Sequence, residues 1–149
     1  LIVSDVSGDV YYFYFNGNVR KSFENDFQDD HFLNVSDLDG DRKNEFVFID
    51  ENKLFTFNNE GELIFDEEYP EKIVFRPIIY EFASNDKKTG VIATKSGRIY
   101  LINNDGSLYQ GFPLQGSSLF SISSFPGLKA RFNLIVGNKN NFLYNYSVK

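Results

Sequence analysis

Hydrophobic residues in this chain come in short runs, separated by Gly, Asn, Asp and Pro. Within the runs the apolar side chains are continuous or alternate with polar ones, as in 46–50 and 99–103. Such runs are typical of β-strands, and the periodicity of an amphipathic helix is absent from the sequence. The pattern therefore predicts an all-β protein.

The pattern also repeats along the chain. Residues 47–63 and 92–108 match in register, without a gap, at a spacing of 45 residues. Partial copies lie at 8–19 and 141–146, each displaced by 44 residues. The predicted strands are 31–36, 46–50, 54–58 and 63–66 in one copy, 77–82, 90–94, 99–103 and 112–114 in the next, and 119–125, 133–137 and 142–148 in the last. Asn and Gly in the turns suit the positive φ angles of tight hairpins.

A four-stranded antiparallel unit that recurs about every 40 to 50 residues is the signature of a β-propeller blade. We predict a single β-propeller segment with blades at approximately 1–30, 31–72, 73–116 and 117–149, the middle two complete and the outer two partial. The side chains expected between blades are Phe48, Phe57, Ile92, Ile102 and Ile135.

The two partial copies suggest that the segment is a fragment of a larger propeller. The first copy lacks its innermost strand and the last lacks its outermost strand, and the chain starts at Leu1 without Met. Exposed apolar blade faces and unpaired strand edges favour association, so an isolated arc is expected to self-associate through its open ends. A compact four-bladed ring with trimmed ends is the alternative.

The composition of the chain indicates what fills its core and excludes some classes of partner. Phe and Tyr must fill the core, because 17% of the residues are aromatic and there is no Trp or Met. The net charge of −6 argues against nucleic acid or an anionic membrane surface as partner. From residue 106 to 149 there is no Asp or Glu, so the negative charge is concentrated earlier in the chain. The absence of Cys excludes disulfides and thiolate sites, and no apolar run predicts insertion into a membrane.

Carboxylates gather in one segment, where Asp37, Asp39, Asp41 and Glu45 occupy relative positions 1, 3, 5 and 9. A turn at Gly40 would fold them around one hard cation, and a backbone carbonyl of the loop would add another oxygen. An EF-hand needs a longer loop and flanking helices, whereas here a strand-like run follows at once. The residues allow a calcium loop or a solvated acidic turn. We expect Ca²⁺, because carboxylates packed this closely repel one another without a cation.

This loop, running into 46–48, resembles the calcium-loop repeat of FG-GAP and VCBS propellers, the type found in integrin α subunits. The segments 97–101 and 104–106 also resemble PQQ-like bacterial propeller repeats. The first resemblance implies a loop between the first two strands of a blade, with the side chains of Asp37, Asp39, Asp41 and Glu45 and the carbonyl of Lys43 as ligands. The sequence departs from the family at Arg42, usually Gly, and at Glu45, usually Asp. In the next repeat, the positions that match these four acidic residues are 82, 84, 86 and 90, and only one of them is acidic. One calcium site is therefore expected.

Catalysis would have to be built on His31, the only histidine. A Ser-His-Asp arrangement and a structural role are the two interpretations of it. The adjacent carboxylates at 29–30 and 67–68 point apart on a strand or turn, which favours solvation over acid–base work. The aromatic run 11–15 would serve either as a carbohydrate-stacking platform or as packing between blades.

These observations lead to a functional hypothesis. The chain is expected to be a non-enzymatic, calcium-stabilised segment that acts as a binding or scaffolding module of a larger protein, with a protein or carbohydrate partner. The alternative is a fragment of a propeller enzyme, such as a polysaccharide lyase or a quinoprotein-like dehydrogenase, whose catalytic residues lie outside this chain. Family analogy and the millimolar calcium outside cells imply an extracytoplasmic location: periplasmic, cell-surface or secreted.

Overall fold

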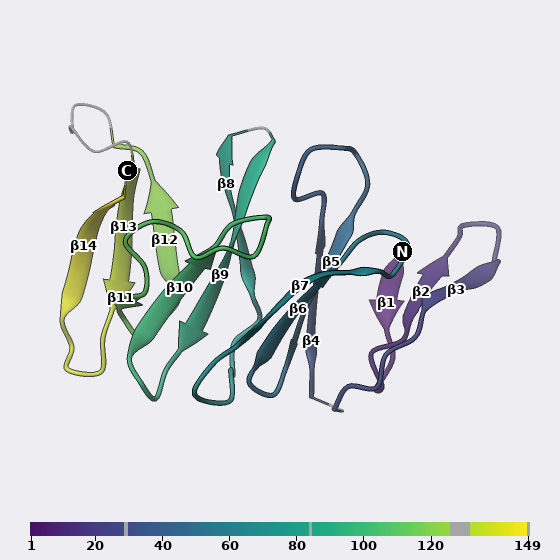
Figure 1. The fold of residues 1–149 in the computed structure, drawn as a ribbon, viewed down its shortest axis with the longest axis horizontal. Helices are drawn as coiled ribbons and strands as arrows, with labels where there is room; N and C mark the ends of the chain where they lie inside the picture. Colours follow the sequence, from purple (N-terminus) through teal and green to yellow (C-terminus); the bar gives the residue numbers. More distant parts are fainter. Residues whose placement is uncertain (29, 84, 126–131, 149) are drawn as a thin grey trace.

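The computed structural model describes residues 1–28, 30–83, 85–125 and 132–148. These residues form β-strands and no α-helix, which confirms the predicted all-β class (Figure 1). The strands make four antiparallel sheets, two of three strands and two of four. None of the described segments is a helix that is long and apolar enough to cross a membrane.

Each sheet is a meander of consecutive strands, in which every strand pairs with its neighbour in the chain. The first sheet contains β1 (Ile2–Ser4), β2 (Val10–Phe13) and β3 (Val19–Phe23). The second contains β4 (Phe32–Ser36), β5 (Glu45–Asp50), β6 (Lys53–Phe57) and β7 (Leu63–Glu68). The third contains β8 (Ile78–Ala83), β9 (Asp86–Ala93), β10 (Arg98–Ile102) and β11 (Leu114–Gln115). The fourth contains β12 (Phe120–Ser123), β13 (Phe132–Gly137) and β14 (Leu143–Val148).

The four sheets follow one another in a row along the longest axis of the molecule. The first sheet lies at one end of this axis and the fourth at the other, so the described sheets do not close into a ring (Figure 1). Consecutive sheets share three apolar layers, one between each neighbouring pair.

Strand β5 shows why the sequence gives this stacking. Neighbouring side chains on a strand point to opposite faces of the sheet. Phe46 and Phe48 pack with Val10 of the first sheet, whereas Val47 and Ile49 pack towards the third. All four are essentially inaccessible to solvent. A strand buried on both faces needs a continuous apolar run, which is what residues 46–49 supply.

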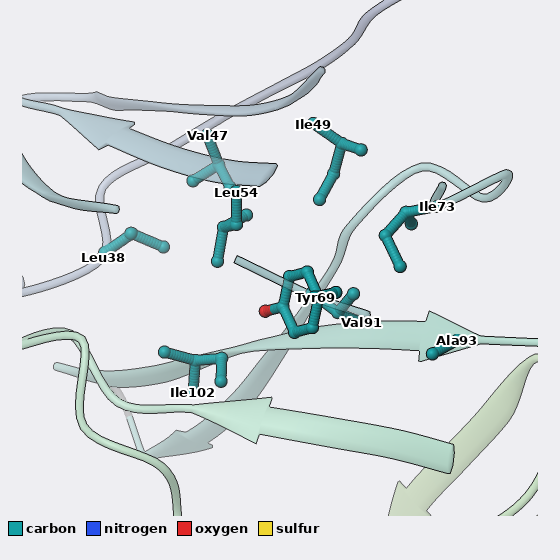
Figure 2. Close-up of a cluster of buried hydrophobic side chains, with 9 residues drawn as sticks. All are labelled: Leu38, Val47, Ile49, Leu54, Tyr69, Ile73, Val91, Ala93 and Ile102. Atoms are coloured by element: carbon teal, nitrogen blue, oxygen red, sulfur yellow. The ribbon is translucent and has the colours of Figure 1, made fainter. Parts of the chain in front are cut away.

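The layer between the second and third sheets is shown in Figure 2. Val47, Ile49 and Leu54 of the second sheet meet Val91 and Ala93 of the third across this layer. The remaining buried members of the layer are Leu38, Tyr69, Ile73 and Ile102.

One core prediction is wrong. Phe48, Ile92 and Ile102 are buried between sheets, and Phe57 packs against the first layer. Ile135 is only half-buried and belongs to none of the three layers, whose members on β13 include its neighbours Leu134 and Val136. The alternation of side chains puts Ile135 on the opposite face of the fourth sheet, which has no following sheet in the described part of the chain.

Five loops share one turn. In each, the N–H of the first residue donates to the carbonyl of the fifth, and the N–H of the fourth donates to the carbonyl of the first. The first residues are Asp5, Tyr14, Asn58, Asn103 and Asn138. The fourth residues all have a positive φ angle, and they are Gly8, Gly17, Gly61, Gly106 and Asn141. The expected role of Gly and Asn in the turns is therefore confirmed at these positions.

Candidate metal centre

The acidic loop joins β4 to β5, the first two strands of the second sheet, at the upper edge of the view in Figure 1. The chain turns at Gly40, where φ is 86°, as the sequence predicts. It turns again at Arg42, where φ is 73°. A non-glycine residue is uncommon in this left-handed region, so the loop holds Arg42 in a conformation that glycine would adopt more easily.

The loop brings three of the four predicted carboxylates together. One oxygen from each of Asp37, Asp39 and Glu45 lies within 4.8 Å of the other two. Asp41 is not in this group, and its Oδ1 instead accepts the backbone N–H of Lys43 at 2.7 Å. The side chain of Lys43 is exposed.

Backbone hydrogen bonds hold two of these carboxylates in place. Asp37 accepts the N–H of Gly40 on Oδ1 at 2.7 Å and the N–H of Arg42 on Oδ2 at 3.1 Å. Asp39 Oδ1 accepts the N–H of Asp41 at 2.9 Å. An ionised carboxylate has about four acceptor sites, so these bonds orient the oxygens and leave others to bind a cation.

Glu45 is the buried member of the group, with 6% of its surface exposed. Its Oε2 accepts the N–H of Leu38 at 2.7 Å. Burial raises the pKa of Glu45, and the charges of Asp39, Asp41 and Asp37 act in the same direction, against the hydrogen bond from Leu38. A buried carboxylate surrounded by like charges is stabilised when a cation pairs with it. The donor set is all oxygen, which suits a hard cation such as Ca²⁺.

The loop is anchored to the third sheet. Leu38 is buried in the layer of Figure 2, and its carbonyl accepts a hydrogen bond from Asn104 Nδ2 at 2.7 Å. Gly40 lies so close to Asn85 that a Cβ there would come within 2.6 Å of Asn85 Cγ. The sequence indicated Asn104 only as a turn residue, because a contact across 66 positions leaves no local pattern.

His31 lies between the first and second sheets. Its Nε2 is 3.0 Å from Ser4 Oγ and its Nδ1 is 2.9 Å from the carbonyl oxygen of Gln28. The ring also packs against Phe27 and Phe48. Among the described residues its hydrogen-bond partners are a hydroxyl and a carbonyl but no carboxylate, so these contacts support the structural interpretation of His31.

The other candidates from the sequence are dispersed. Asp29 lies outside the described residues, and Asp30 pairs with Lys72 at 2.5 Å. Glu68 lies 3.6 Å from Lys53 on the strand surface. The aromatic run splits between the two faces of the first sheet: Tyr12 packs edge-on against Phe46, whereas the side chain of Phe13 is 44% exposed.

Comparison with known proteins adds no relative. No protein-family model matches the sequence, and no curated protein matches it.

Proposed function

We propose that the chain is a calcium-stabilised β-propeller segment of the FG-GAP and VCBS type, which acts as a non-enzymatic binding or scaffolding module. The observation that carries the calcium part is the group formed by Asp37, Asp39 and Glu45, with Glu45 buried. These three side chains are the proposed ligands, and Asp41 and the carbonyl of Lys43 are the further ligands that the resemblance implies.

The propeller part is supported by the repeated sheets. Four antiparallel meanders follow one another in the chain, and each consecutive pair is joined by an apolar layer. Blades of a propeller are four-stranded sheets of this kind. The row of Figure 1 corresponds to an arc of such a structure, which other blades would complete.

The calcium loop fits a structural role in this arrangement. Through Leu38 and Asn104 it connects the second sheet to the third. A cation bound to the loop would neutralise carboxylates beside a buried layer and so stabilise this junction. We place the protein outside the cytoplasm by analogy with the resembling families, in whose extracellular calcium modules weak sites are filled by the calcium present there.

Thermal unfolding with and without calcium tests the proposal. Calcium at about 100 times its Kd would stabilise the fold by about 2.7 kcal/mol. Asp39→Ala should abolish this gain without unfolding the protein, because Asp39 is exposed. The matched control is Asp66→Ala, which removes an exposed Asp of β7 and should keep the gain. Magnesium should substitute poorly, since it requires a rigid octahedral site. Equal melting temperatures with and without calcium would reject the proposed stabilisation.

A further inference from the structure

A polar cavity with a positively charged lining lies between the third and fourth sheets. It has a volume of about 300 Å³ and is lined by the β9–β10 turn, the residues that follow β11 and the β13–β14 turn. Both hairpin turns lie at the lower edge of Figure 1, whereas the acidic loop lies at the upper edge. The cavity and the proposed calcium loop are therefore at opposite ends of the sheets.

Backbone contacts build the wall of this cavity. The N–H of Gly116 donates to the carbonyl of Gly97 at 3.0 Å, and the N–H of Ser117 donates to the carbonyl of Gly137 at 2.9 Å. Gly116 is buried, and a Cβ there would come within 3.0 Å of Val136 Cγ1. The segment from 115 to 117 thus fits closely against both neighbouring turns, which fixes the lining residues relative to one another.

The charge of the lining is opposite to that of the whole chain. Lys95, Arg98 and Lys139 line the cavity, and no Asp or Glu does. All three are exposed, and none of them is in a salt bridge within the described ranges. The carboxylate of Glu71 accepts the backbone N–H groups of Lys95 and Ser96 at 2.6 and 2.7 Å, although Glu71 itself does not line the cavity. The Lys139 ammonium donates to the carbonyl of Lys95 at 3.2 Å. Three cations without a salt bridge at one place in a chain of net charge −6 favour an oxyanion as ligand.

The rest of the lining is suited to hydroxyl groups. Gln115, Ser117 and Asn140 each carry both a donor and an acceptor, as sugar hydroxyls do. The volume would hold roughly ten waters, which is more space than a free sulfate or phosphate ion fills. We propose that this cavity binds an acidic saccharide, a polyhydroxylated ring that carries a carboxylate or a sulfate. The inference rests on the proposed function as a binding module and gives that module a ligand class.

Calorimetric titration of the calcium-saturated protein tests the inference. The probes are a uronate disaccharide and a sulfated disaccharide, with neutral maltose and inorganic sulfate as comparisons. Both acidic disaccharides should bind, and maltose and free sulfate should bind at least about tenfold more weakly, because each meets only part of the lining. The double variant Lys95→Gln/Lys139→Gln should lower the affinity for the acidic disaccharides by about tenfold or more. Arg20→Gln, which removes one exposed cation from the first sheet, should leave it unchanged.

Four results would overturn the inference. They are no binding of either acidic disaccharide, sulfate binding as tightly as the sulfated disaccharide, competition by a poly-glutamate peptide at equal affinity, and unchanged affinity in the double variant. Asp39→Ala should keep saccharide binding, since the loop and the cavity are at opposite ends of the sheets. A protein that binds the saccharides but not calcium would contradict the proposed calcium site and leave this inference standing.

Discussion

At the scale of single residues, most of the side chains that the sequence predicted to lie between sheets are found there. Phe48 and Ile92 belong to central strands with continuous apolar runs, so their burial follows from composition alone. Ile135 also lies within a continuous apolar run of its strand, yet its side chain is on the outer face of the fourth sheet. Its position depends on whether another sheet follows, which the residues around it do not encode.

Truncation of these two residues should therefore have different effects on stability. Phe48→Ala removes a fully buried ring from the first layer and should lower the free energy of unfolding by about 3–5 kcal/mol. Ile135→Ala removes a half-buried side chain outside the layers and should cost clearly less. Urea unfolding of both variants measures the difference, and equal losses would show that the outer face is also packed.

At the scale of elements, strands and turns were predicted well because both have local signals. The observed strands of the second sheet begin and end within two residues of the expected ones. In the third sheet β9 begins at Asp86, four residues before the predicted start, because it pairs with β8 up to Ala83. The acidic loop was found from its spacing, but the position of Asp41 outside the group of three carboxylates and the contact with Asn104 follow from the loop's fold and its tertiary packing.

The shared five-residue turn provides a matched pair of glycines. Gly17 and Gly106 occupy the same place in the turn, with φ angles of 83° and 85°. Alanine at either position should cost roughly 1–2 kcal/mol for the left-handed backbone. At Gly17 a Cβ meets nothing within 4 Å, whereas at Gly106 it would lie 2.8 Å from Phe65 Cγ in the preceding sheet.

Gly106→Ala should thus be the more destabilising variant, by a further 1–3 kcal/mol or so for overpacking. Thermal unfolding of the two variants isolates the contact between sheets, because the backbone cost is common to both. Equal losses of stability in the two variants would contradict a close contact between the turn at Gly106 and Phe65 of the second sheet.

At the scale of the whole molecule, the row of sheets has an exposed face at each end. Val10 and Tyr12 face the second sheet, so Phe13 and its cross-strand partner Val19 lie on the outer face of the first sheet, 44% and 53% exposed. On the outer face of the fourth sheet Ile135 is flanked by Ser121 and Asn145, and the same face carries Leu143, which is 73% exposed. Exposed apolar side chains on an end face favour association, and on the first sheet two of them are paired across neighbouring strands.

The isolated chain is therefore expected to associate through its first sheet. Sedimentation at micromolar concentration should show two copies associating as concentration rises, and Phe13→Lys/Val19→Lys should shift the equilibrium to the monomer. Ser121→Lys/Ser147→Lys, which places the same charges on exposed polar positions of the fourth sheet, should not. A monomer at every concentration would contradict association through an open end.

Calcium titration followed by calorimetry tests the central claim most directly, because it measures the occupancy of the loop itself. The wild-type chain should bind one Ca²⁺ per molecule, with a Kd at or below the millimolar range. Asp39→Ala should show no binding heat under the same conditions, and Asp66→Ala should bind as the wild type does. Binding of no calcium at millimolar concentration, or unchanged binding by Asp39→Ala, would contradict the assignment of Asp37, Asp39 and Glu45 as a calcium site.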